Sequence, residues 1–176
     1  MILGRKFYQK NTLRVAQDLL GCFLVRKISR KIIRAKITET EAYIGEDDLA
    51  SHASKGRTKR TEIMYGQAGQ AYIYMVYGMY FCLNVVTEKK NFPAAVLIRS
   101  VEIEGIDYKK TNGPGKLCKV LKINKELNDW DLTKGEKIWI EPAQNSAKRN
   151  FKAGRRIGID YAKHCRHYLW RFYINN

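Results

Sequence analysis

The fold of this chain is decided by the stretch Ala71-Tyr-Ile-Tyr-Met-Val-Tyr-Gly-Met-Tyr-Phe-Cys-Leu-Asn84. Aromatic and β-branched residues favour strands, and a glycine inside such a run marks a turn. The pattern predicts two strands, 71–77 and 80–86, joined as a hairpin around Tyr77-Gly78. Five rings gather about this turn: Tyr72, Tyr74, Tyr77, Tyr80 and Phe81. Flat rings suit a surface that stacks on nucleobases or separates them, although Tyr72 and Tyr80 also suit ordinary sheet packing.

The chain around the hairpin is strongly basic, with 33 Lys and Arg against 17 Asp and Glu and a net charge of +16. The alternative to a binding surface is an ordinary solvated one, but an excess this large favours a polyanion such as nucleic acid. Residues 39–48 depart from the trend, because they hold five acids and no base. Those acids are Glu39, Glu41, Glu46, Asp47 and Asp48.

Length and composition set the class of protein. A chain of 176 residues with 45% hydrophobic content can bury a core as one domain. No apolar run approaches the roughly 20 residues that a membrane span needs. The N-terminus lacks the apolar stretch of a signal peptide. We therefore expect an intracellular monomer without membrane contact.

The four cysteines are Cys22, Cys82, Cys118 and Cys165, and no two of them form a CxxC pair. In an intracellular protein such residues are reduced thiols in or near the core. A zinc site at His164-Cys165-Arg166-His167 is the alternative, but the sequence offers no second half for it. We expect no metal and no cofactor.

Periodicity and turn signals predict a domain in which strands predominate. Helices are expected at 12–20, capped by Asn11 or Thr12, and at 112–122, where a proline stands at the start. The remaining strands are expected at 22–28, 32–44, 94–101, 137–141, 155–159 and 169–174. Residues 45–63 form a polar connection that is too long for a tight turn, and loops of this length often carry functional residues. These elements describe a single compact α+β domain over residues 1–176.

Two charged residues interrupt apolar strand faces. Strict alternation along 32–44 places one set of side chains on a shared face: Ile33, Ala35, Ile37, Glu39, Glu41 and Tyr43. Likewise Arg99 would share a face with Ala95, Leu97 and Val101. Glu41 and Arg99 could form a structural ion pair. Alternatively, one carboxylate could activate water and stabilise the cationic sugar that forms when DNA loses a purine. From the residues alone, Glu39 and Glu41 remain equal candidates for this role.

Three blocks of sequence resemble the alkyladenine (3-methyladenine) DNA glycosylase family. They are Thr38-Glu-Thr-Glu-Ala-Tyr43-Ile-Gly, Asp47-Asp-Leu-Ala-Ser-His52, and Tyr72-Ile-Tyr-Met-Val-Tyr-Gly-Met-Tyr-Phe-Cys-Leu-Asn84. Residues 94–99, 112–118 and 156–159 follow in matching order, so the resemblance covers roughly residues 5–174. It implies a mostly antiparallel curved sheet with flanking helices and a protruding hairpin that enters the DNA minor groove.

The resemblance also implies a reaction. Enzymes of this kind flip an alkylated or deaminated purine out of duplex DNA and hydrolyse its N-glycosidic bond, leaving an abasic site. Their substrates include 3-methyladenine, 7-methylguanine, hypoxanthine and ethenoadenine. Glu41 corresponds to the general base that deprotonates water, while Arg99 and the backbone carbonyl of Ile157 would help to hold that water.

Further positions match the residues that surround the flipped base. Tyr43, His52 and Tyr74 would form the base pocket, with both tyrosines supplying aromatic faces. Asn84 would lie on the pocket floor and disfavour the exocyclic amine of guanine. Tyr77 would fill the gap that the flipped nucleotide leaves in the duplex.

Two other functions compete with the glycosylase. The first is a catalytically inactive protein that binds lesions, and the second is an RNA-binding protein that uses the same charge and rings. The joint presence of Glu41, Arg99 and Tyr77 favours the enzyme. The expected partner is double-stranded DNA that contains damaged purines.

Overall fold

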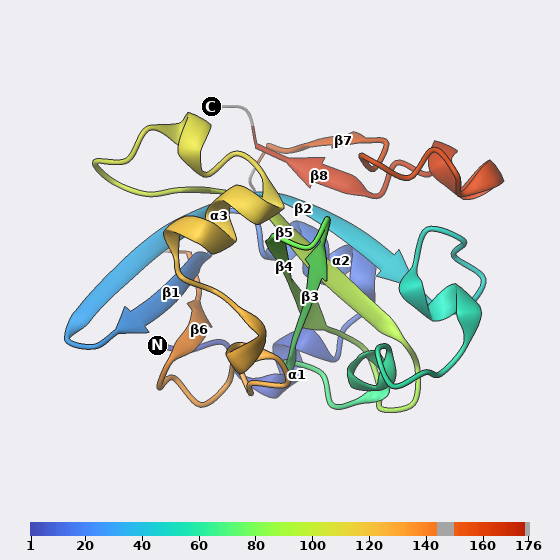
Figure 1. Cartoon of the computed structure of the whole chain (residues 1–176), viewed down its shortest axis with the longest axis horizontal. Coiled ribbons are helices and arrows are strands. Elements are labelled where there is room, and N and C mark those ends of the chain that lie inside the picture. The colour runs from blue at the N-terminus through green and yellow to red at the C-terminus, as the bar shows by residue number, and fades with distance from the viewer. Residues whose placement is uncertain (144–149, 175–176) are drawn as a thin grey trace.

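The computed structural model describes residues 1–143 and 150–174, which form an α+β domain around a curled antiparallel sheet (Figure 1). The strand order is β3-β4-β5-β2-β1-β6, with β8 beside β2 and β7 beside β8. The strands are β1 Phe23–Ile28, β2 Lys31–Ile44, β3 Ala71–Val76, β4 Tyr80–Val86, β5 Ala94–Glu102, β6 Ile138–Glu141, β7 Lys152–Gly154 and β8 Arg171–Tyr173. The predicted fold class is confirmed.

The length of β2 makes it the centre of the sheet. Its first half pairs with β1, residues 39–41 pair with β8, and β5 runs along the other edge from residue 36 to residue 44. Figure 1 shows β2 and β5 crossing the molecule together. Groups carried by β2 can therefore meet groups from both the early and the late parts of the chain.

Helices cover the sheet on two sides, with α2 behind it and α3 in front of it in the view of Figure 1. They are α1 Arg5–Tyr8, α2 Thr12–Asp18 and α3 Pro114–Val120, accompanied by the short 3₁₀ turns η1 His52–Lys55, η2 Glu62–Tyr65, η3 Tyr108–Lys110, η4 Lys125–Leu127 and η5 Lys163–His167. As predicted, the Asn11 side chain caps α2, where it accepts from the N–H groups of Leu13 and Arg14. In the described part of the chain, no helix has the length and apolar character needed to cross a membrane.

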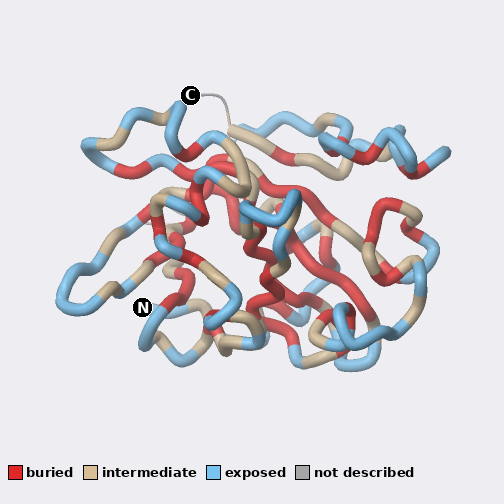
Figure 2. The backbone as a smooth tube through the Cα atoms, viewed as in Figure 1, coloured by how far each residue is buried: buried red, intermediate tan, exposed pale blue. Residues whose placement is uncertain are grey.

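The main core lies between the sheet and these helices, and Figure 2 shows buried backbone along the central strands. Its largest fully buried side chains include Leu19, Leu24, Ile37, Leu83, Ile98 and Leu121. All four cysteines are buried and none forms a disulfide, which confirms the prediction of reduced thiols.

An irregularity in β2 and β5 corrects the predicted strand faces. The pairing shifts on both sides of Glu39, so that Ile37 faces Val101 and Thr40 faces Ile98. Ala35 and Ile37 enter the main core before the irregularity, whereas Ala42 enters it afterwards. A β-bulge bends a strand and interrupts strict alternation. The prediction of one continuous face from Ile33 to Tyr43 is therefore wrong, since Glu41 and Tyr43 point to the opposite side.

The same correction applies to β5. Val96 and Ile98 lie in the main core, and so does Val101 beyond the irregularity. Leu97 and Arg99 point away from that core and line a pocket. The prediction that Val101 shares their face is wrong for the same geometric reason.

The predicted strand at 155–159 is also wrong. The strand in this region is β7, Lys152–Gly154, and residues 155–159 belong to no strand. Side chains hold two polar groups of this segment: the Ile157 N–H donates to Glu41 Oε1 at 2.9 Å, and the Arg155 carbonyl accepts from Arg171 Nε at 2.8 Å. Gly158 follows with a φ of +75°, a conformation that interrupts an extended run.

Helix α3 packs directly on the hairpin through Gly115. A Cβ atom placed there would lie 2.9 Å from Cβ and Cδ1 of Tyr80, which is closer than real contacts allow. At Gly113, one residue before the helix, the nearest atom to such a Cβ is Lys116 Cδ at 3.6 Å, an ordinary contact. Helix α3 therefore supports β4 at a point where only glycine fits.

We expect Gly115→Ala to lower the free energy of unfolding by about 1 kcal/mol. Overpacking costs about 1–3 kcal/mol, and the better helix propensity of alanine returns up to about 1 kcal/mol. Gly113→Ala is the control without a close contact; it exchanges the N-cap residue of α3, where alanine is less favourable than glycine, and should cost less than Gly115→Ala. Denaturant unfolding measures both. Equal stabilities of the two variants would contradict the close packing of α3 on β4.

Candidate active site

A pocket of about 320 Å³ opens on the side of β2 and β5 that faces away from the core residues Ala42, Val96 and Ile98. All eight residues singled out in the sequence line it: Glu41, Tyr43, His52, Tyr74, Tyr77, Asn84, Arg99 and Ile157. They come from β2, β3, β4, β5, the η1 turn, the hairpin tip and the 155–159 segment. This volume lies within the range of small-molecule sites.

Strand register explains why distant residues meet here. Tyr72 lies opposite Asn84, Asn84 lies opposite Leu97, and Leu97 lies opposite Glu41. This row crosses β3, β4, β5 and β2 in turn, and side chains in one row of an antiparallel sheet share a face. The irregularity at Glu39 is what brings Glu41 onto this row's side of the sheet rather than the core side.

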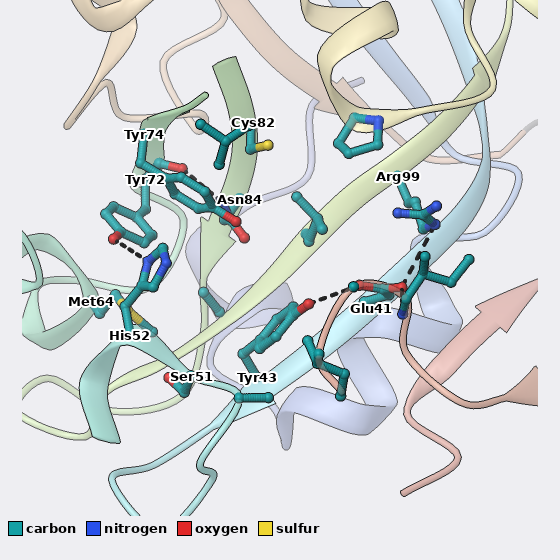
Figure 3. Close-up of a pocket in the computed structure, with 18 of the residues that line it drawn as sticks. Glu41, Tyr43, Ser51, His52, Met64, Tyr72, Tyr74, Cys82, Asn84 and Arg99 are labelled. Carbon is teal, nitrogen blue, oxygen red and sulfur yellow. Dashed lines mark hydrogen bonds and ion pairs between the residues drawn. The ribbon is translucent and has the colours of Figure 1, made fainter. Parts of the chain in front are cut away.

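Glu41 lies fully buried at one end of the pocket, with both carboxylate oxygens occupied (Figure 3). Oε1 accepts from the Ile157 N–H at 2.9 Å, and Oε2 accepts from the Tyr43 hydroxyl at 2.8 Å. Burial raises the Glu41 pKa above its ordinary value, while Arg99, the Ile157 N–H and the Tyr43 hydroxyl each lower it. The carboxylate is thus more basic than an exposed one and is still hydrogen-bonded in its charged form.

Arg99 belongs mainly to Glu39 rather than to Glu41. Its Nε lies 3.2 Å from Glu39 Oε1 and 3.6 Å from Glu41 Oε1. Glu39 also accepts from Arg171 at 2.8 Å and from Ser100 at 2.9 Å. Arg99 therefore already has a carboxylate partner, and Glu41 is not needed as its counterion.

This arrangement separates the two acidic candidates. Glu39 is held by three donors and is not among the residues that line the pocket, whereas Glu41 lines its end. The sequence left the two equal because alternation places both on one face. The irregularity between them could not be read from the pattern.

Aromatic side chains form the two walls of the pocket. Figure 3 shows Tyr72, Tyr74 and His52 on one side and Tyr43, with Glu41, on the other. Burial raises the Tyr43 pKa well above its ordinary value, and the neighbouring Glu41 adds to this effect. Tyr43 therefore stays protonated and remains a hydrogen-bond donor to Glu41.

Asn84 is buried and lines the pocket. Its Nδ2 donates to the Tyr72 carbonyl at 3.1 Å, so the amide is fixed across the hairpin. Cys82 and Leu97 line the same region. A side chain fixed in this way limits the shape of any ring that enters.

His52 contacts Tyr72 and Tyr74 within the same wall of the pocket, and the sequence did not suggest the contact with Tyr72. His52 Nδ1 lies 2.9 Å from the Tyr72 hydroxyl, and the His52 ring meets Tyr74 edge-on with centroids 4.5 Å apart. Tyr72 is thus more than a sheet-packing residue. Tyr72 and Tyr74 alternate along β3 as in any strand, and this pattern does not indicate that His52, 20 residues earlier in a loop, contacts Tyr72.

The hairpin tip projects beside the pocket. Tyr77 is 90% exposed and has a φ of +52°, and Gly78 follows with a φ of +67°. Positive φ is uncommon for a bulky residue and matches the primed turns that close tight hairpins. Met75 and Met79 are exposed beside it, so the tip is an apolar projection on a highly basic protein.

The alternative metal site gains no support from the geometry. Among the residues that the structure describes, no three His, Cys, Asp or Glu side chains gather to hold a metal ion. Cys165 is buried, and its Sγ lies 3.5 Å from His164 Nε2 and 3.7 Å from the Asp47 carbonyl.

The comparisons with known proteins agree with this geometry. The family model for methylpurine-DNA glycosylase (MPG) matches residues 6–176. The chain belongs to the methylpurine-DNA glycosylase family. It is therefore an enzyme of the class that hydrolyses N-glycosyl bonds.

Curated relatives are similar over nearly their whole length, as three proteins named "Putative 3-methyladenine DNA glycosylase" illustrate. The protein from Clostridium perfringens (strain SM101 / Type A) is 45% identical over 199 residues, which cover 100% of this chain and 97% of the relative. The protein from Methanocella arvoryzae is 46% identical over 188 residues, covering 99% and 93%. The protein from Legionella pneumophila (strain Corby) is 45% identical over 174 residues, covering 99% and 94%.

We predict that His52 of this family member remains neutral throughout the physiological pH range. Its pKa is lowered to about 4, first by burial and then by the positive charges of Arg60 and Lys55. The imidazole resonances, assigned by their loss in His52→Gln, should not move between pH 8 and pH 5.5. A titration midpoint near the ordinary value of 6.5 would contradict this environment.

Proposed function

We propose that this protein excises alkylated or deaminated purines, including 3-methyladenine, 7-methylguanine, hypoxanthine and ethenoadenine, from double-stranded DNA. One observation carries the proposal. A buried carboxylate, Glu41, stands at the end of a pocket with aromatic walls, and an exposed aromatic residue, Tyr77, projects beside the opening.

In this proposal the base enters between the two aromatic walls. Tyr43 lies on one side and Tyr74 on the other, which is the arrangement that a flat purine needs for stacking. Cationic bases such as alkylated purines gain further from electron-rich ring faces. Asn84 restricts the floor, where the exocyclic amine of guanine would project.

Glu41 acts as the general base on the attacking water. Its ionised form also stabilises the positive charge that develops on the sugar as the base departs. Arg99 and the backbone of Ile157 border the same space and orient that water. Because Glu41 has no exposed surface in the free protein, a small side-chain movement must admit the water when DNA binds.

Tyr77 acts on the duplex rather than on the reaction. Its ring enters the minor groove and occupies the space that the flipped nucleotide vacates, which offsets part of the cost of unstacking. The net charge of +16 supplies the phosphate attraction that brings the tip to the duplex. The protein acts as a monomer on one lesion at a time.

We expect Glu41→Gln to retain lesion binding and to slow base release by about 10²–10⁴-fold, the usual contribution of a general base. Single-turnover excision from a duplex with one hypoxanthine measures the rate, and a binding titration measures affinity. Glu102→Gln removes the same charge from the exposed end of β5 and should leave the rate unchanged. If Glu39→Gln abolishes release and Glu41→Gln does not, the general base is Glu39. Binding by the wild-type protein without any release would instead favour the inactive lesion-binding alternative.

We expect Tyr77→Ala to weaken capture of the flipped base by about 1–3 kcal/mol, the value of one stacking contact, with less effect on binding to undamaged DNA. Tyr77→Phe keeps the ring and should keep the flipping equilibrium. A fluorescent base analogue that brightens on unstacking reports the flipped fraction. An unchanged fraction in Tyr77→Ala would exclude the ring from this role.

A further inference from the structure

A buried ion pair between Arg156 and Asp48 lies next to the pocket without lining it. Arg156 Nη1 contacts Asp48 Oδ2 at 2.5 Å, and Nη2 contacts Oδ1 at 2.8 Å, so the pair is bidentate. Arg156 is 4% exposed and Asp48 is 2% exposed. Asp48 also accepts from the N–H groups of Ile44 and Ala50, which ties the loop after β2 to the pair.

Both terminal nitrogens of the Arg156 guanidinium are hydrogen-bonded, whereas its buried Nε has no hydrogen-bond partner among residues 1–143 and 150–174. Its Cζ lies over two rings, 4.7 Å from the centroid of Tyr43 and 5.0 Å from the centroid of Trp170. Nη1 donates to the Ala42 carbonyl at 2.9 Å, and Nη2 donates to the Cys165 carbonyl at 3.3 Å. Lysine offers no planar fork for such a site, so the position is specific for arginine.

Both hydrogen bonds to the Glu41 carboxylate depend on this residue. Arg156 directly precedes Ile157, whose N–H donates to Oε1, and no strand ladder holds the 155–159 segment. Arg156 also stacks on Tyr43, whose hydroxyl donates to Oε2. The Arg156 guanidinium therefore helps to place the Ile157 N–H and to orient the Tyr43 ring.

We propose that the Asp48–Arg156 pair is a positioning device that sets the two hydrogen-bond donors of Glu41 without touching the substrate. The inference rests on the proposed role of Glu41 in base excision. A purely structural role is the alternative, but a buried ion pair is often no more stabilising than apolar residues of similar volume. Arg156 stacks on Tyr43 and directly precedes Ile157 in the chain, and these two contacts indicate a role in addition to stability.

The consequence is a defined effect on pH dependence. Glu41 must be ionised to act, so excision falls as the pH falls through its pKa. The Ile157 N–H and the Tyr43 hydroxyl stabilise the ionised form. Losing their alignment raises the pKa of Glu41 and moves the acid limb of the rate profile to higher pH.

Other groups also face Glu41 and must stay unchanged in the test. They come from five strands and are Glu39 and Tyr43 on β2, Tyr74 on β3, Cys82 on β4, Arg99 on β5, and Arg171 on β8, which acts through Glu39. Arg156 in the 155–159 segment also faces Glu41 and is the group that the test changes. Arg156→Lys retains a positive charge at its site. A shift in that variant therefore reports geometry rather than lost charge.

The experiment measures single-turnover release of hypoxanthine from duplex DNA against pH for the wild-type protein, Arg156→Lys and Arg5→Lys. Arg5 forms an ion pair with Asp131 at 2.6 Å and does not line the pocket, so it controls for loss of a structural arginine contact. We expect the acid limb of Arg156→Lys to move up by about one pH unit. Two or three backbone hydrogen bonds together can lower the pKa of a carboxylate by about two units, so the loss of one such bond accounts for a shift of this size. The limb of Arg5→Lys should stay in place.

A slower Arg156→Lys whose acid limb coincides with that of the wild-type protein would overturn the inference, since the pair would then be structural only. If Arg156→Lys does not fold, Asp48→Asn replaces it and should also move the acid limb to higher pH. Loss of the Asp48 charge by itself would lower the Glu41 pKa, so an upward shift in this variant again reports geometry. Failure of the proposed function looks different. In that case the wild-type protein releases no hypoxanthine, or Glu41→Gln releases it normally, and the inference about Arg156 falls with it.

Discussion

The site depends on how the fold accommodates the buried carboxylate of Glu41. An ionised carboxylate away from water is costly, by several kcal/mol or more in effective terms, unless donors meet its oxygens. Here an amide N–H and a tyrosine hydroxyl do so, with an arginine 3.6 Å away. Each hydrogen bond to a charged group contributes about 1.5–3 kcal/mol, so these two donors, together with the charge of Arg99, support the ionised form of Glu41.

Glu39 makes this balance possible. It accepts from Arg99, Arg171 and Ser100, and so it shares the positive charge of Arg99 that Glu41 would otherwise face alone. A base with a close arginine counterion would have a lowered pKa and less ability to accept a proton. The acidic cluster in a basic chain thus has two separate purposes: Glu39 holds arginine, and Glu41 remains available.

The sequence predicted much of the fold because local signals were strong. Alternating aromatic residues with a central glycine identified the hairpin, and Asn11 identified the start of α2. Resemblance to a known family then selected eight residues that all line one pocket. The alternation rule failed at Glu39, where two strands shift register together, because a bulge leaves no mark in a hydrophobic pattern.

Contacts between residues that are distant in the chain also could not be predicted from the sequence. Asp48 and Arg156 are 108 residues apart, and neither stands out among neighbouring acids and bases. The 155–159 segment looks like a strand from its apolar residues, yet Glu41 and Asp48 determine its conformation through side-chain contacts. Such features arise from tertiary structure and become visible only when the strands are assembled.

The central claim is that the aromatic pocket receives a purine from DNA and presents its glycosidic bond to Glu41. A crystal structure of the Glu41→Gln variant with a duplex carrying one hypoxanthine tests this most directly. The account predicts the base between Tyr43 and Tyr74, the Tyr77 ring in the vacated stack, and a water between residue 41 and the sugar. A well-resolved complex in which the hypoxanthine stays paired in the duplex, with the pocket empty and Tyr77 outside the stack, would contradict it.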